Sequence, residues 1–351
     1  MIMMKCRPYF SVVISCYNPD DRLAMLLDSL VIQNEDIEVI ISDDCSTKDY
    51  MDIVEPYKDK LRLKFVKTEK NFAPSITRET GARAATGKWL TFSDQDDEYY
   101  PEAFSIVREY IEAANEQNFA FGIFDEINPE SKEVGKTFEC SFSWTHGKFY
   151  NLDNFWHKHN IHYRPLKTHE DIYLCSLTNC LLVSSNNEAL YIPRHIYKWY
   201  AWKDSVSRSK YIKDGEGHSF LEVAFQDYID STGSVYLEKY LDGTNDKDFG
   251  IFNCLEVLMD VYFYFIGFVS LEPETYIKEN KQLSKRYFER VKQTFNVDTD
   301  FILGYINKYP GWYCKTREGC QMATGPFVPV MTFKDFLYWI DEESMEIKNE
   351  C

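Results

Sequence analysis

The chain has 351 residues, with 39 Lys and Arg residues against 56 Asp and Glu residues and a formal net charge of −17. This length accommodates one large domain or two ordinary ones, with a substantial buried core. The acidic balance argues against an extended basic surface for nucleic acid.

The N-terminal sequence and the longest apolar stretch indicate where the protein is expected to reside. The N-terminal sequence MIMMKCRPYFSVV leads directly into a strand pattern, without the long apolar region of a signal peptide. The apolar residues 261–271 fall short of the about 20 residues that cross a bilayer, so we expect a buried helix there and no transmembrane segment. We therefore expect a cytoplasmic protein, either free or peripheral to a membrane. Ten cysteines without a C-x-x-C pair indicate reduced, mostly buried thiols.

The first hundred residues alternate short β-branched runs with helical patterns, which is typical of a mostly parallel sheet. After the first strand, Asn18 is expected to cap a helix with Pro19 at its first position. The even spacing of the strands predicts a doubly wound, Rossmann-like α/β half-domain, which binds ligands at the carboxyl ends of its strands. The predicted strands are residues 10–16, 37–42, 61–66 and 89–93, with a helix at 75–85.

The remaining pattern divides the chain into two parts. A helix is expected from Pro101 to about Asn115 and a strand at 119–124, followed by a loop-rich, aromatic stretch at 128–169. Residues 170–183 are expected to form a helix, or a helix and then a strand. From about Gly215 the pattern is mainly helical. We therefore predict a catalytic domain at 1–214 and a mainly helical region at 215–351.

The stretch TFSDQDDEYYPE, residues 91–102, gathers Asp94, Asp96, Asp97 and Glu98 after a predicted strand. Asp43 and Asp44 follow another strand, so both acidic groups are expected at the same sheet edge. Clustered carboxylates raise one another's pKa values unless a cation compensates, and carboxylate oxygens suit Mg²⁺ or Mn²⁺. The alternative is a solvated acidic turn that caps the helix near Pro101.

Five segments follow one another in a recognisable order: SVVISCYN (11–18), IEVIISDDCST (37–47), NFAPSITRETGARAATGKWLTFSDQDD (71–97), HED (169–171) and YAWKDSVSR (200–208). With these segments, the chain resembles family 2 glycosyltransferases of the GT-A fold over roughly residues 8–210. The departures are Ala73 in place of the family's Gly, Thr77 in place of Ala, Glu79 in place of Asn, and Cys45 in place of a small turn residue.

The resemblance implies a role for each matching residue. Ser15 and Tyr17 would line the nucleoside pocket, and Asp44 would contact the base. Arg78 and Arg208 would approach the diphosphate. Asp96 would hold the metal ion, with Asp94 contacting it or the ribose. Asp171 would be the base that deprotonates the acceptor, with Glu170 as its substitute.

The resulting hypothesis is a metal-dependent, inverting transfer of a single sugar from a nucleotide-sugar, expected to be a UDP-sugar, to a glycan or lipid-linked sugar. The absence of the Q-x-x-R-W element of processive family members favours a non-processive enzyme. Two alternatives remain. A nucleotidyltransferase would carry a Gly-rich loop after its first strand, where this chain reads CYNPDD. A non-catalytic GT-A-like binding protein would not need all of the matching aspartates.

Overall fold

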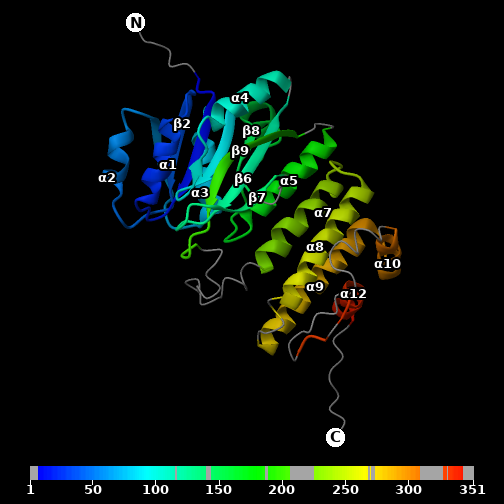
Figure 1. Cartoon of the computed structure of the whole chain (residues 1–351). Coiled ribbons are helices and arrows are strands. Elements are labelled where there is room, and N and C mark those ends of the chain that lie inside the picture. The colour runs from blue at the N-terminus through cyan, green and yellow to red at the C-terminus, as the bar shows by residue number, and fades with distance from the viewer. Residues whose placement is uncertain are drawn as a thin grey trace. The chain divides into compact units, whose positions relative to one another are not determined.

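The computed structural model describes residues 7–114, 117–139, 144–185, 189–205, 225–267, 269, 273–308, 327–329 and 331–342. The chain divides into two compact units, Met1–Lys210 and Tyr211–Cys351. The first unit holds the sheet and the second is built from helices (Figure 1).

The described part of the first unit contains one sheet of nine strands in the order β3-β2-β1-β4-β8-β6-β9-β5, with β7 paired to β6. Strands β3, β2, β1 and β4 are parallel, whereas β8 is antiparallel to both β4 and β6. The predicted doubly wound, mostly parallel half-domain is therefore confirmed. The strands are β1 (Phe10–Cys16), β2 (Ile37–Asp43), β3 (Arg62–Lys67), β4 (Trp89–Asp94), β5 (Glu98–Tyr99), β6 (Phe119–Ile127), β7 (Val134–Phe138), β8 (Lys148–Asn151) and β9 (Leu190–Tyr200).

Helices cover both faces of the sheet (Figure 1). Helices α1 (Arg22–Val31) and α4 (Ala103–Ala114) bury their apolar stripes against alternate residues of β1 and β2. Helix α3 (Pro74–Ala84) lies on the opposite face and contacts α5 (Glu170–Ser184). A Cβ atom at Gly81 would lie 2.3 Å from Val13 Cγ1, so the close approach of α3 to β1 requires glycine there. A short helix, α2 (Met51–Val54), follows β2.

Two local predictions were wrong, and one strand was missed. Asn18 does not cap α1, which begins at Arg22; its side chain instead accepts hydrogen bonds from the backbone N–H groups of Thr47 and Lys48. The stretch predicted as loop-rich contains β7, β8 and a π-helix, Leu152–His157, because its aromatic side chains are buried in the sheet's flank. Strand β9 was not predicted at all.

The loop before α3 contains a strained residue. Ala73 has φ 69° and ψ 173°, a region of backbone conformation that is adopted essentially only by glycine. Its carbonyl group accepts a hydrogen bond from Thr77 Oγ1, and its N–H group donates to Asp44 Oδ2 at 3.0 Å. The surrounding contacts therefore hold Ala73 in a backbone conformation in which its Cβ atom is sterically unfavourable.

We expect Ala73→Gly to raise the free energy of unfolding by about 1 kcal/mol, because relief of the strain exceeds the entropy cost of glycine. Urea denaturation of the whole chain measures this change. In contrast, Ala82→Gly, inside α3, is expected to lower stability by about 0.5–1 kcal/mol. A loss of stability in both variants would show that Ala73 is unstrained.

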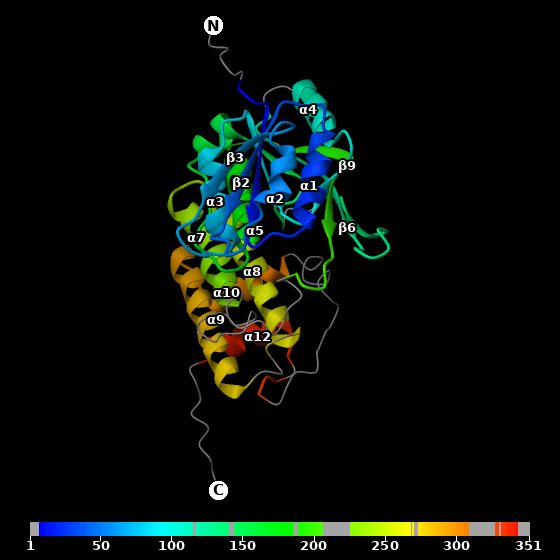
Figure 2. The ribbon, with the colours of Figure 1, turned by 90° about the vertical axis from the view of Figure 1, so that its left-hand side faces the viewer.

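The second unit is helical in its described residues. Figure 2 shows α7, α8 and α9, which contact one another. Helix α8 has the length and hydropathy of a membrane-spanning helix, but 61% of its most apolar stretch is buried within the protein, as in the core helix of a globular domain. The predicted buried helix is thus confirmed over residues 261–267. The elements are a π-helix (Tyr228–Gly233), α7 (Ser234–Leu241), α8 (Lys247–Gly267), α9 (Glu274–Phe295), α10 (Thr299–Asn307) and α12 (Phe333–Asp341).

Candidate active site

Polar side chains from three parallel strands meet at one edge of the sheet. Ser15 of β1 lies beside Asp94 of β4, and Cys16 of β1 lies beside Asp43 of β2. Because the carboxyl ends of parallel strands share an edge, the residues that follow them also gather there. The predicted meeting of the two acidic groups at one edge is therefore confirmed.

A buried arginine connects this edge to the helix that carries the predicted base. Arg78, on α3, is 5% exposed. Its Nη2 donates to Asp94 Oδ1 at 2.5 Å, and its Nη1 donates to Glu170 Oε1. Burial raises the pKa of Asp94, but Arg78 outweighs this effect and holds that pKa below its usual value. The guanidinium predicted to meet a diphosphate thus joins two carboxylates that belong to different elements, with Glu170 lying 92 residues after Arg78 in the chain.

The pKa values of Asp96 and Asp97 are raised in this crowded acidic cluster. Burial, and then the charge of Asp94, raises the pKa of Asp96 to about 7, although Arg22 opposes the shift. Asp97 is 1% exposed, and burial together with its two acidic neighbours raises its pKa well above the usual value. A cation bound among these carboxylates would oppose both shifts.

The carboxyl groups fit a divalent cation by charge and by ligand type. Arg22 Nη1 lies 3.7 Å from Asp96 Oδ2 and partly offsets its charge. A second combination is also present: Asp94, Asp97 and His146 offer three ligand atoms within 4.8 Å of one another. However, Asp97 already accepts hydrogen bonds from Tyr197 Oη at 2.7 Å and the Tyr200 N–H group at 2.9 Å. The residues therefore fit a metal ion, and the pair Asp94 and Asp96 remains a prediction.

The sequence analysis did not identify two residues that lie at this edge. Arg22, in the first turn of α1, forms ion pairs with Asp20 and Asp204 in addition to Asp96. Trp202 lies under the Arg22 guanidinium, 5.0 Å from it, and its Nε1 donates to the Asp96 carbonyl group at 2.9 Å. The aromatic residue in YAWKDSVSR was a signal for Trp202, whereas nothing in the local sequence pointed to Arg22.

The predicted base lies in the first turn of α5. Glu170 is 9% exposed and is held by Arg78, whereas Asp171 is only partly buried. Burial, and then the charge of Glu170, raises the pKa of Asp171 to about 7, against the opposing effects of Arg78 and Lys148. Of the two acidic residues, Asp171 therefore has the properties of a general base at neutral pH.

The predicted nucleoside-binding residues lie on the same edge. Tyr17 is 45% exposed, and its N–H group donates to Gln95 Oε1 at 2.9 Å. Asp44 is buried and accepts hydrogen bonds from the N–H groups of Phe72 and Ala73, so its carboxylate also holds the loop before α3. Ser15 interacts with Asp94. Arg208 lies outside the described residues.

A model of the family described as "Glycosyl transferase family 2" matches residues 11–182, which span β1 to α5 and include the acidic edge, Arg78 and Asp171. Residues 11–182 belong to glycosyltransferase family 2. The resemblance found in the sequence motifs is therefore confirmed.

Two curated relatives share part of this family 2 segment. Poly(ribitol-phosphate) β-N-acetylglucosaminyltransferase TarS of Staphylococcus aureus is 35% identical over 107 residues, which are 29% of this chain and 19% of TarS. Validoxylamine A glucosyltransferase of Streptomyces hygroscopicus subsp. limoneus is 42% identical over 91 residues, 25% of this chain and 20% of that protein. The chain thus matches about a fifth of the length of these relatives.

Solved structures share the fold of this chain. The structure of S. aureus TarS 1–349 in complex with UDP has a TM-score of 0.64 at 16% identity, covering 95% of this chain and 90% of that one. The complex of TarS 1–349 with UDP-GlcNAc has a TM-score of 0.61 at 15% identity, with the same coverage. At this identity the likeness shows the fold alone, and the predicted GT-A fold is confirmed.

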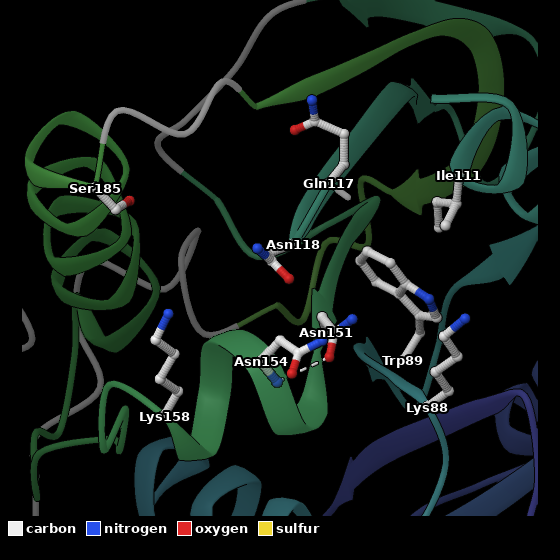
Figure 3. Close-up of a pocket in the computed structure, with 9 residues that line it drawn as sticks. All are labelled: Lys88, Trp89, Ile111, Gln117, Asn118, Asn151, Asn154, Lys158 and Ser185. Atoms are coloured by element: carbon white, nitrogen blue, oxygen red, sulfur yellow. Dashed lines mark hydrogen bonds between the residues drawn. The ribbon is translucent and has the colours of Figure 1, made fainter. Parts of the chain in front are cut away.

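A pocket of about 530 Å³ lies away from the acidic edge of the family 2 fold (Figure 3). Trp89 begins β4 and Asp94 ends it, so a strand of six residues, about 17 Å, separates the pocket's Trp89 from the acidic cluster. The pocket therefore belongs to the opposite edge of the sheet and not to the predicted donor site. It is lined by Lys88, Trp89, Ile111, Gln117, Asn118, Asn151, Asn154, Lys158 and Ser185.

Proposed function

We propose that the chain is an inverting, non-processive glycosyltransferase that moves one sugar from a UDP-sugar to an acceptor hydroxyl group. The observation that carries the proposal is the bridge of Arg78 between Asp94 and Glu170. Through it, a single buried guanidinium fixes the acidic strand edge relative to the first turn of α5, where Asp171 lies. Such an arrangement suits a reaction that needs a donor site and a base in fixed geometry.

The donor would bind at the carboxyl edge of β1, β2 and β4. The exposed ring of Tyr17 and the carboxylate of Asp44 border the place where a nucleoside would lie. The TarS structures that share this fold contain UDP and UDP-GlcNAc, which supports a uridine nucleotide as the donor. The planar fork of Arg78 matches two phosphate oxygens. Arg208 is proposed as a further phosphate contact.

Asp94 and Asp96 would hold a Mn²⁺ or Mg²⁺ ion, which as a Lewis acid offsets the negative charge that develops on the departing diphosphate. The raised pKa of Asp96, caused by burial and by Asp94, is the property of this chain that supports the assignment. Asp97 would act differently. Its two hydrogen bonds to β9 fix the turn on which Asp94 and Asp96 stand.

Asp171 would act as the general base. Its carboxylate takes the proton of the acceptor hydroxyl group while the acceptor oxygen bonds to the anomeric carbon and the bond from that carbon to the diphosphate breaks. Attack on the face opposite the leaving group inverts the anomeric configuration. A pKa of about 7 leaves Asp171 substantially ionised near neutral pH and still basic enough to accept the proton.

We propose a glycan or lipid-linked sugar as the acceptor, with the helical unit contributing to its site. The name of the relative TarS, a poly(ribitol-phosphate) β-N-acetylglucosaminyltransferase, supports a carbohydrate-type acceptor. The division of labour would place donor binding and catalysis in residues 1–214 and acceptor selection partly in residues 215–351.

Calorimetry with UDP, with and without Mn²⁺, tests this function. We expect UDP to bind in the presence of Mn²⁺ and binding to disappear on addition of a chelator, because the diphosphate needs a cation among the carboxylates. A screen of nucleotide-sugars for slow hydrolysis, with water replacing the acceptor, would then identify the sugar. If neither UDP nor another nucleoside diphosphate binds in the presence of Mn²⁺, the proposal is wrong.

A further inference from the structure

A buried lysine beside the predicted base is not used in the mechanism above. Lys148 begins β8 and is 1% exposed. Its Nζ makes no hydrogen bond within the described part of the chain. A buried ammonium group without hydrogen bonds is costly, and an apolar residue of similar shape would avoid the cost. The presence of lysine at this position therefore calls for a reason other than packing.

The alternation of β8 directs Lys148 toward α5. Phe149 points to the core on the other face of the sheet, where it contacts Phe10 and Phe104. Lys148 and Tyr150 point the opposite way, as residues two apart on a strand must. Tyr150 lies against Thr178 of α5, and Lys148 interacts with Cys175, one turn nearer the start of that helix.

One more turn along this stripe of α5 lies Asp171. Residues 171, 175 and 178 share one face of the helix, because they are spaced by four and three residues. The charges of Lys148 and Asp171 interact. The Cys175 thiol donates to the Trp144 carbonyl group at 3.5 Å, and its sulfur also faces Lys148. The thiol is uncharged near neutral pH, so Asp171 is the acidic side chain on this face of α5 whose charge the ammonium group meets.

We propose that Lys148 is a positioning residue for catalysis, whose ammonium group holds Asp171 as a carboxylate and orients it on the buried stripe of α5. This inference rests on the proposed role of Asp171 as the base. Two cations thus act on the acidic pair of α5: Arg78, which is bound to Glu170 and also favours the carboxylate of Asp171, and Lys148, which acts on Asp171 from β8.

Several other groups face Asp171 and set its protonation. Burial lowers the pKa of Lys148, against the opposing effects of Cys175 and Asp171. Burial raises the pKa of Cys175 to about 11, so the thiol is uncharged near neutral pH. Removing Lys148 thus removes a cation, whereas removing Cys175 removes volume and a thiol hydrogen bond but no charge. The Ile172 N–H group donates to Asp171 Oδ1 at 2.8 Å. The titratable groups that interact with Asp171 are Glu170 and Cys175 of α5, Arg78 of α3, Lys148 of β8, and Tyr163.

The test compares Lys148→Met with Cys175→Ala in the full chain without ligands. Carbon NMR of ¹³C-labelled Asp carboxyl groups, assigned with Asp171→Asn, reports the protonation of Asp171. Loss of a nearby cation makes the carboxylate harder to form, so its midpoint should rise by about one pH unit in Lys148→Met. Cys175→Ala should leave the midpoint unchanged. In Lys148→Met, the acidic limb of UDP-sugar hydrolysis should move to higher pH by the same amount. At pH values below the midpoint, the variant should therefore react about tenfold more slowly than the parent.

Thermal unfolding separates this role from a structural one. Because Met removes a buried ammonium group that forms no hydrogen bond in the described residues, Lys148→Met should melt higher, by roughly 2–4 °C. A folded variant with an unchanged Asp171 midpoint, an equal shift in Cys175→Ala, or a variant that fails to fold would each overturn the inference. Absence of donor binding in the parent protein would instead refute the proposed function, and the NMR titration distinguishes the two failures.

Discussion

Asp96→Ala is expected to lower Mn²⁺-dependent binding of UDP by at least about 100-fold and to abolish donor hydrolysis. Asp96 forms an ion pair with Arg22, and burial together with the charge of Asp94 raises its pKa to about 7. Removing a carboxylate ligand weakens binding of the cation, and without the cation the negative charge of the diphosphate is not neutralised. Calorimetry with UDP and Mn²⁺, together with electron paramagnetic resonance of bound Mn²⁺, measures the loss.

Asp59→Ala is the matched control, since Asp59 is exposed and follows η1 (Glu55–Tyr57), far along the chain from the acidic turn. Its Mn²⁺ and UDP affinities should equal those of the parent. If Asp96→Ala still binds Mn²⁺ normally and His146→Ala does not, the ion belongs to Asp94, Asp97 and His146. That result would contradict the assignment of Asp96.

Asp171→Asn is expected to slow sugar transfer and donor hydrolysis by about 1,000-fold while leaving the affinity for UDP and Mn²⁺ within about twofold. The amide keeps the shape of the side chain but cannot accept the proton of the acceptor. In the parent, activity should rise with pH through about 7, because the ionised form of Asp171 is the base. The variant should lose this acidic limb.

Donor hydrolysis measured between pH 5 and 9, alongside calorimetry at pH 7.5, tests this prediction. Loss of UDP binding in Asp171→Asn would place Asp171 among the donor contacts and not in the role of base. A variant with the parent's rate and pH profile would transfer the role to another residue.

Much of the donor edge was predictable because it depends on local patterns. Parallel strands with short connections bring their carboxyl ends to one edge, so strand positions alone placed Ser15, Asp44 and Asp94 together. The resemblance to the family motifs predicted Arg78 and Asp171 as further site residues, because each occupies a fixed position within its motif. The replacement of the family's glycine by Ala73 was also visible in the sequence, but its consequence, a φ of 69°, appeared only in the structure.

Strand β9 shows where local reasoning fails. Its sequence, LYIPRHIYKWY, contains Pro193 and does not alternate regularly, and its pairing with β6 shifts register near Gly122. Proline and broken alternation normally argue against an inner strand. Tertiary contacts nevertheless stabilise it, and through Tyr197 and Tyr200 it holds Asp97. A propensity weaker than about 1 kcal/mol per residue is readily overridden by such packing.

The sequence by itself therefore determined the fold class, the edge that carries the acidic residues and the candidate base, since these follow from periodicity and ordered motifs. Only the tertiary structure decided which charges meet. It joined Arg78 to Glu170 across 92 residues, placed Arg22 at Asp96, and set Lys148 against the stripe of α5 that carries Asp171. These pairings depend on how helices and strands distant in the chain pack together, and local sequence carries no record of that packing.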